Sequence, residues 1–164
     1  MADQLVYCMV EIPKGSRNKY EWDEELKAIT FDRFLFSSVV YTLDYGMIPE
    51  TLAEDGDPLD VMVAVSEPTF PGCVIPAKPI ALFKMQDEKG IDDKVICVPL
   101  QDPNWNECER LEDLPVQMRD EVANFFAIYK TLEQKDVKVE GWRSREDAWT
   151  VIEAARQRWA ERGK

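Results

Sequence analysis

Short runs rich in valine and isoleucine, separated by proline, glycine and aspartate, fill the first two thirds of the chain. This pattern predicts β-strands at residues 5–12, 28–31, 59–65, 74–85 and 94–99. In the third run, apolar residues occupy every second position, and Asp60 lies on the opposite side from them. This alternation is typical of a half-buried strand. We therefore expect Asp60 to face away from the core.

The last third of the chain changes to a helical period. Apolar residues recur at spacings of three and four, which predicts one helix that Pro115 can begin, with the stripe Met118, Val122, Phe125, Phe126, Tyr129 and Leu132. Ser144 and Asp147 resemble a capping box, and a second apolar stripe follows at Trp149, Ile152, Ala155 and Trp159. The pattern therefore predicts an α+β, mainly β fold, in which two C-terminal helices pack on a small, strongly bent sheet or barrel.

Length and composition indicate one globular unit. The 164 residues are 45% apolar and 32% charged and contain no internal repeat or linker, so we expect a single domain over residues 1–164. No uncharged apolar run is long enough to span a bilayer, and the N-terminus lacks the basic start of a signal peptide. We therefore expect a cytoplasmic protein. The four cysteines form no C-x-x-C pair, which favours reduced thiols.

Charge and the absence of histidine narrow the function. A net charge of −12 argues against binding to nucleic acid or to an anionic membrane, since both need clustered lysine and arginine. The chain contains no histidine, which removes Ser/His and Cys/His nucleophiles and the commonest zinc ligand. Acid-base or metal chemistry must therefore come from carboxylates, lysines and tyrosines.

Two acidic segments are candidates for that chemistry. Residues 55–60 place Asp55, Asp57 and Asp60 around Gly56 and Pro58, a bend that can turn three carboxylates toward one point. Like charges gathered in this way favour a cation such as Mg²⁺, Mn²⁺ or Ca²⁺, although a solvated acidic turn has the same pattern. An EF-hand is a poor fit, because its spacing requires glycine where Asp60 stands.

The second segment, residues 87–94, contains four acids and reads as a hairpin loop turned by Lys89 and Gly90. Taken alone, it is better explained as a charged surface loop, and it gains weight as a site only together with the first segment.

The segment from Asp55 to Val61 resembles the signature of the soluble inorganic pyrophosphatases of the first family. The resemblance covers nearly the whole chain, with further matching segments in the same order: Glu11-Ile12-Pro13, Asn18-Lys19-Tyr20-Glu21, Asp32-Arg33, Tyr41 through Tyr45-Gly46, Lys84-Met85 through Asp87 and Lys94, Phe125-Phe126 through Tyr129-Lys130, and Val137-Lys138-Val139 with Gly141-Trp142. Thr42 and Met47 depart from the family pattern, which has proline and an aromatic residue there. These departures bear on local backbone shape more than on chemistry.

The resemblance implies a fold, an activity and a set of site residues. The fold would be a small closed five-stranded (OB-like) β-barrel with flanking strands and two C-terminal helices. The metal ligands would be Asp55, Asp60, Asp87 and Asp92, with Glu11 and Glu21 in support. The residues that bind the phosphates would be Lys19, Arg33, Tyr41, Lys94, Tyr129 and Lys130. Tyr45 would line the cavity, and Asp57 would be the catalytic base. Asp92 is assigned as the ligand in preference to Asp93 by counting back from Lys94.

The implied reaction is hydrolysis of pyrophosphate to two phosphates by direct attack of a metal-activated water. Seven acids face four bases in the implied site, so the excess of negative charge by itself requires divalent cations before a polyanion can enter. The cofactor would be Mg²⁺, with Mn²⁺ or Zn²⁺ as substitutes and Ca²⁺ as an inhibitor. The resemblance also implies a homo-oligomer, a hexamer. The alternatives are a metal-dependent hydrolase of polyphosphate or nucleotides and a non-catalytic divalent-metal-binding protein.

Overall fold

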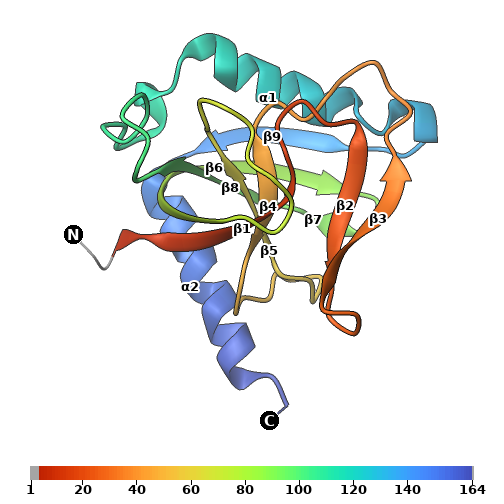
Figure 1. Ribbon diagram of the computed structural model, residues 1–164, viewed down its shortest axis with the longest axis horizontal. Helices are drawn as coiled ribbons and strands as arrows, with labels where there is room; N and C mark the ends of the chain where they lie inside the picture. Colours follow the sequence, from red (N-terminus) through yellow and green to blue (C-terminus); the bar gives the residue numbers. More distant parts are fainter. Residues whose placement is uncertain (1–3, 164) are drawn as a thin grey trace.

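The computed structural model describes residues 4–163, which form strands in the first hundred residues and helices mainly after them (Figure 1). The elements are β1 (Val6–Ile12), β2 (Asn18–Asp23), β3 (Ala28–Phe34), β4 (Asp44–Ile48), β5 (Leu59–Val63), β6 (Val74–Asp87), β7 (Gly90–Ile91), β8 (Lys94–Pro99), α1 (Val116–Ile128), β9 (Lys138–Arg143) and α2 (Arg145–Glu161), with two short 3-10 helices, η2 (Leu111–Asp113) and η3 (Thr131–Glu133). The predicted α+β, mainly β class is confirmed. Within the described residues, no helix is both long and apolar enough to cross a membrane.

Five strands close into a ring. They pair in the order β1, β4, β5, β8 and β6, and β6 pairs back to β1 through Val6–Ala77 to Met9–Val74. All pairs in the ring are antiparallel except β5 with β8. The predicted closed five-stranded arrangement is thereby confirmed, with β7 and β9 added along β6 as flanking strands.

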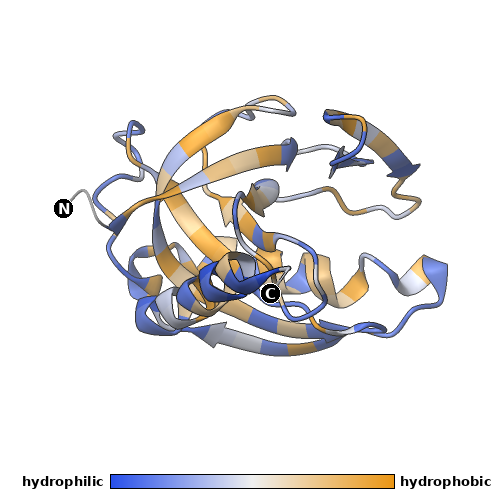
Figure 2. Ribbon diagram, turned by 90° about the horizontal axis from the view of Figure 1, so that it is seen from below, coloured by the Kyte–Doolittle hydropathy of each residue, from blue (hydrophilic) through white to orange (hydrophobic). Residues whose placement is uncertain are grey.

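Both faces of the ring are buried, which corrects the expectation of a half-buried strand at residues 59–65. Val61 and Val63 of β5 pack in one apolar cluster with α2, but Met62 and Ala64 are also fully buried, in a second cluster with α1. A strand covered on both faces carries apolar residues at successive positions. Asp60 does point to the opposite side from Val61, and it meets a cavity there. Figure 2 shows the apolar residues concentrated on the ring strands, whereas α2 is mainly hydrophilic.

The two helices begin where the sequence predicts. Ser144 caps α2 by accepting a hydrogen bond from the Asp147 amide (3.2 Å), and the Asp147 carboxylate accepts one from the Ser144 amide (3.3 Å), so the capping box is confirmed. Pro115 is the N-cap of α1. The predicted stripe is too long, however. Helix α1 ends at Ile128, and Leu132 is 64% exposed in η3.

Strands β2, β4, β7 and β9 were not predicted, and β2 lies at the site. Strands β2 and β3 form a two-stranded sheet separate from the ring, seen as the upright hairpin in Figure 1. Strand β2 contains charged residues at alternate positions and no valine or isoleucine, and β4 contains Gly46, so neither gives the usual strand signal. Strand β9, which pairs with β6, likewise interleaves charged residues and glycine.

Gly46 provides a test of how tightly the ring is closed. It lies on β4 opposite Val10, and a Cβ atom there would lie 1.9 Å from the Met9 carbonyl oxygen and 2.9 Å from the Val10 Cα. Both atoms belong to the backbone and cannot move aside. We predict that Gly46→Ala lowers the free energy of unfolding in urea by about 3 kcal/mol or more. Gly72→Ala is the control, because open space surrounds its Cβ position and only its positive φ is strained, at about 1 kcal/mol. Equal destabilisation of the two variants would contradict the close packing at Gly46.

Candidate active site

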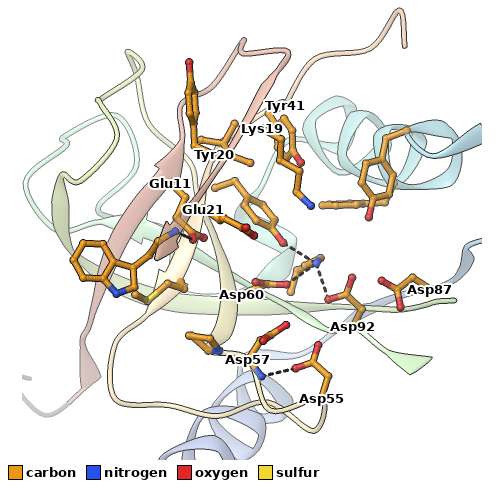
Figure 3. Close-up of a pocket in the computed structure, with 18 of the residues that line it drawn as sticks. Glu11, Lys19, Tyr20, Glu21, Tyr41, Asp55, Asp57, Asp60, Asp87 and Asp92 are labelled. Atoms are coloured by element: carbon orange, nitrogen blue, oxygen red, sulfur yellow. Dashed lines mark hydrogen bonds and ion pairs between the residues drawn. The ribbon is translucent and has the colours of Figure 1, made fainter. Parts of the chain in front are cut away.

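A cavity of about 240 Å³ opens between the hairpin β2–β3, the ring and the end of α1 (Figure 3). Thirteen of the fourteen site residues named from the sequence line it: the acids Glu11, Glu21, Asp55, Asp57, Asp60, Asp87 and Asp92, the lysines Lys19, Lys94 and Lys130, and the tyrosines Tyr41, Tyr45 and Tyr129. These residues come from six separate stretches of chain. The fold therefore brings together side chains that lie as far apart as Glu11 and Lys130.

Arg33 is the one predicted site residue that the structure places outside the cavity wall. Its guanidinium instead contacts Asp32 on its own strand and Glu133 after α1. Lys89 takes the fourth basic place in the wall. Seven carboxylates and four lysines thus line the cavity, which leaves a formal excess of three negative charges.

The acidic loop between β4 and β5 is held in shape by its own backbone. Gly56 adopts a φ of +88°, which favours glycine, and the Asp57 amide donates a hydrogen bond of 2.9 Å to the Asp55 carboxylate. A second bond runs from the Ala53 amide to the Asp57 carbonyl (2.7 Å). Asp55 and Asp57 therefore face the cavity from a short closed turn, while Asp60 faces it from strand β5.

Lys94 is the centre of the polar contacts in the cavity. Its ammonium group donates hydrogen bonds to Asp60 (2.7 Å), to Asp92 (2.8 Å) and to the Tyr45 hydroxyl (2.8 Å), and the side chain is only 2% exposed. Burial lowers the pKa of Lys94, but the two carboxylates more than offset this and hold that pKa above its usual value. Lys94 is therefore charged and joins strands β5 and β8 to the residue after β7.

Burial, and to a smaller extent the gathered negative charge, raises the pKa of three other acids of the cavity. Burial, with Asp60 and Glu21 nearby, raises the pKa of Glu11 to about 7, against a hydrogen bond from the Trp22 amide (2.8 Å) that lowers it. Burial and Asp55 raise the pKa of Asp57. Burial likewise raises the pKa of Asp92, with Asp60 adding to the shift. Cations in the cavity would relieve this repulsion.

The chemistry of the lining fits divalent cations that prefer oxygen ligands. Carboxylate oxygens are the ligands of Mg²⁺ and related ions, and all seven acids face one space. Within residues 4–163, however, no three of the carboxylates and cysteines stand close enough together to hold a single ion. The Lys94 ammonium lies between Asp60 and Asp92 and satisfies both of them.

Neighbouring acids separate into different surroundings. Asp93 pairs with Lys84 (3.1 Å) and lines only a second cavity, of about 210 Å³, on the α2 side of the acidic loop, whereas Asp92 lines both cavities. The turn of the β6–β7 hairpin falls at Glu88 and Lys89, one residue before the position expected from the sequence.

Three contacting residues were missed by sequence reasoning. They are Glu88, Lys135 and Glu133. Glu88 accepts a hydrogen bond from Lys130 (3.3 Å) and forms an ion pair with Lys135 (3.7 Å). Glu133 contacts Arg33. Each is a charged residue in a polar segment, and only the fold reveals its partner. Of the two departures noted in the sequence, Met47 lines the cavity opposite Asp60, and the Thr42 hydroxyl is buried with no hydrogen-bond partner among residues 4–163.

The contacts of Lys94 predict how the protein behaves when no metal ion is present. Lys94→Met leaves Asp60 and Asp92 facing each other with no cation between them. We expect it to lower the free energy of unfolding, measured by urea titration in a chelating buffer, by about 3 kcal/mol. Lys27→Met removes an exposed lysine paired with Glu24 and should leave the unfolding midpoint unchanged. A Lys94→Met variant as stable as the parent would show that the ammonium is not needed there.

Comparison with known proteins agrees with this geometry. The inorganic pyrophosphatase family matches residues 8–160. A protein named inorganic pyrophosphatase from Methanosarcina mazei is 54% identical over 100% of this chain and 98% of its own length, and one from Haloferax volcanii is 48% identical over 98% and 91%. The crystal structure of the inorganic pyrophosphatase from Thermus thermophilus superposes with a TM-score of 0.93 at 42% identity, covering 96% of this chain and 92% of that one. Family, relatives and fold all agree, and the chain belongs to the inorganic pyrophosphatase family.

Proposed function

We propose that this protein hydrolyses inorganic pyrophosphate to two phosphates and uses Mg²⁺ as its cofactor. The observation that carries the proposal is the shared cavity, in which seven carboxylates, four lysines and three buried tyrosines meet. The names of the relatives support the same substrate. A polyanion needs cations to enter a cavity with an excess of negative charge, and carboxylates are the ligands that would hold them.

Each acid has a distinct role in the proposal. Asp55, Asp60, Asp87 and Asp92 hold the metal ions, and Glu11 and Glu21 orient them or hold a further one. When bound, such ions neutralise the charge of the substrate and lower the pKa of water. Asp57 accepts the proton of the attacking water. Its raised pKa brings its proton affinity closer to that required of a base near neutral pH.

The bases and tyrosines bind the two phosphates. Lys19 and Lys130 face the cavity from opposite sides, on β2 and after α1, and so can contact the two ends of the substrate. Arg33 reaches the substrate from the rim, and Tyr41 and Tyr129 donate hydroxyl groups. Burial raises the pKa of both tyrosines, which keeps them protonated as donors. The water oxygen bonds to phosphorus as the bridging P–O bond breaks, so no covalent intermediate with the protein forms.

We also propose that residues 1–164 act as one domain, in the cytoplasm, and that copies of the chain associate, with a hexamer as the expected state. Large apolar side chains that remain exposed support association, among them Tyr7 (56%), Phe31 (60%) and Phe70 (62%). Sedimentation velocity would measure the mass of the assembly, and a monomer at micromolar concentration would contradict this.

The activity is tested by phosphate release from pyrophosphate, with ATP and tripolyphosphate as competing substrates. We expect rapid release from pyrophosphate with Mg²⁺, none with excess chelator, and little release when Ca²⁺ replaces Mg²⁺, because Ca²⁺ is larger and coordinates more loosely. Mn²⁺ or Zn²⁺ should restore part of the activity. Faster release from tripolyphosphate or ATP would identify a different hydrolase, and metal binding without release would identify a binding protein.

The role of Asp57 has its own test. Asp57→Asn keeps the size of the side chain but cannot accept the proton, so we expect kcat to fall at least about 100-fold at saturating Mg²⁺. The matched control is Asp93→Asn, in an acid that pairs with Lys84 outside the cavity. Near-normal turnover in a folded Asp57→Asn protein would show that another group is the base.

A further inference from the structure

The hairpin β2–β3 carries Lys19 and Glu21 into the cavity, yet little of its own structure fixes its position. Within the described residues it forms a separate two-stranded sheet, and all its side chains are exposed or only half-buried. A two-stranded ribbon without further strands is marginally stable in water. Contacts to the rest of the protein therefore help to hold it in place. Tyr20 packs against the apolar core, backbone hydrogen bonds join Gly15 and Ser16 to Tyr41 just before β2, and polar side-chain contacts add to these.

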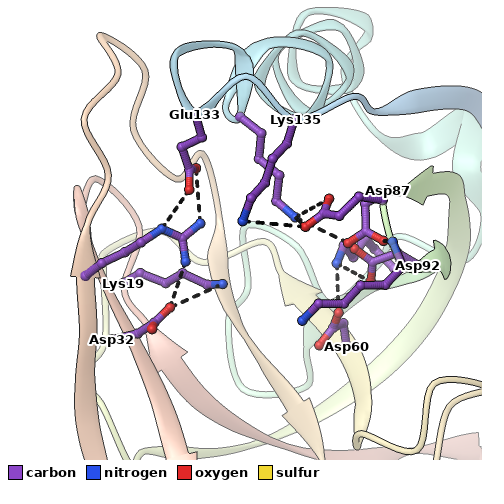
Figure 4. A network of polar contacts seen from close by, with 12 residues as sticks. Lys19, Asp32, Asp60, Asp87, Asp92, Glu133 and Lys135 are labelled. Atoms are coloured by element: carbon purple, nitrogen blue, oxygen red, sulfur yellow. Dashed lines mark hydrogen bonds and ion pairs between the residues drawn. The ribbon is translucent and has the colours of Figure 1, made fainter.

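Two such contacts stand at opposite ends of the hairpin. Near the turn, the Trp22 amide donates to the Glu11 carboxylate on β1. At the open end, Arg33 meets Glu133: its Nη2 donates to Oε2 at 3.1 Å, and its Nε lies 3.0 Å from Oε1 as a close ion pair (Figure 4). The Glu133 side chain is 9% exposed, so this pair is largely shielded from water.

Glu133 lies in the segment that follows the opposite wall of the cavity, although it does not itself line the cavity. It ends η3, and its amide donates to the Lys130 carbonyl at 3.0 Å, so it moves with the turn that carries Tyr129 and Lys130. The Arg33–Glu133 pair thus joins two segments that are 100 residues apart and that face each other across the cavity.

The contacts of Arg33 leave it able to reach a substrate. Its Nη1 donates to Asp32 at 2.8 Å, and Asp32 also lies 3.6 Å from the Lys19 ammonium. An arginine has five N–H donors, and Glu133 and Asp32 face three of them. These contacts leave two of its N–H donors free to bind a phosphate.

We propose that Glu133 is a positioning residue: through its ion pair with Arg33 it holds the hairpin wall, and with it Lys19 and Arg33, at the correct distance from Lys130 to bind the two phosphate groups together. The inference rests on the proposed function for its substrate, but the ion pair and its effect on the hairpin are independent of that function.

A simple charge effect predicts the opposite outcome, which makes the proposal testable. Glu133→Gln removes a negative charge near a cavity that binds a polyanion, so charge alone would tighten binding and lower KM. If Glu133 instead positions the hairpin, Glu133→Gln raises KM for pyrophosphate about tenfold, as expected when a charged hydrogen-bonded pair is broken. The kcat should stay within about twofold, because Lys19 and Arg33 bind the phosphates of substrate and transition state alike.

Two further variants complete the kinetic experiment. Glu133→Asp keeps the charge but shortens the side chain, so it should raise KM in the same direction as Glu133→Gln. Glu109→Gln is the control, since it removes a carboxylate that pairs with Lys78 and Arg145 and does not line the cavity. Its KM should match that of the parent protein.

Hydrogen exchange measures the hairpin directly and requires no activity. In Glu133→Gln and Glu133→Asp we expect the amides of β2 and β3 to exchange about tenfold faster, with those of β5 and β8 unchanged. Hairpin exchange at the parent rate, or a KM at or below the parent value, would overturn the proposal. If the parent protein releases no phosphate from pyrophosphate, the proposed function fails, and hairpin exchange alone then decides whether Glu133 holds the hairpin.

Discussion

Repulsion among the carboxylates of the cavity is the constraint on which the rest of the site depends. Seven acids face one space, and the chain itself supplies buried cations to some of them: the Lys94 ammonium hydrogen-bonds to Asp60 and Asp92, and Lys130 pairs with Asp87. The four lysines of the wall do not balance the seven acids, and burial together with the neighbouring carboxylates raises the pKa values of Glu11 and Asp57. An arrangement that disfavours its own charges in this way is suited to hold divalent cations.

The architecture supplies the rigidity that such a cavity needs. The closed ring is buried on both faces, by α1 on one side and α2 on the other, and it fixes Asp60, Tyr45 and Lys94 from three of its strands. The opposite wall is less constrained, because the hairpin β2–β3 lies outside the ring. Because the ring is rigid and the hairpin wall is held partly by side-chain contacts, the distance between the phosphate-binding groups on the two walls can depend on a single residue such as Glu133.

The fold class and most of the residues that line the cavity could be predicted from the sequence, whereas several strands could not. The capping box at Ser144 and the apolar runs were readable because local chemistry alone produces them. Strand β2 was not recognised, because its pairing with β3 does not depend on apolar alternation. Strand β5 was wrongly expected to be half-buried, because the helices that cover its two faces are distant in the sequence. Thirteen of the fourteen site residues taken from the family motifs line the cavity. Arg33 lies outside the cavity wall and pairs with Glu133, which is 100 residues away in the sequence and which no local pattern reveals.

The central claim, that the gathered carboxylates exist to hold divalent cations, is tested most directly by anomalous X-ray scattering from crystals grown with Mn²⁺. The account predicts manganese peaks within about 2.0–2.3 Å of carboxylate oxygens of Asp55, Asp60 and Asp92, with the Lys94 ammonium moved away from at least one of its two acids. Crystals that hold manganese only at surface acids outside the cavity, with the contacts of Lys94 unchanged, would contradict it.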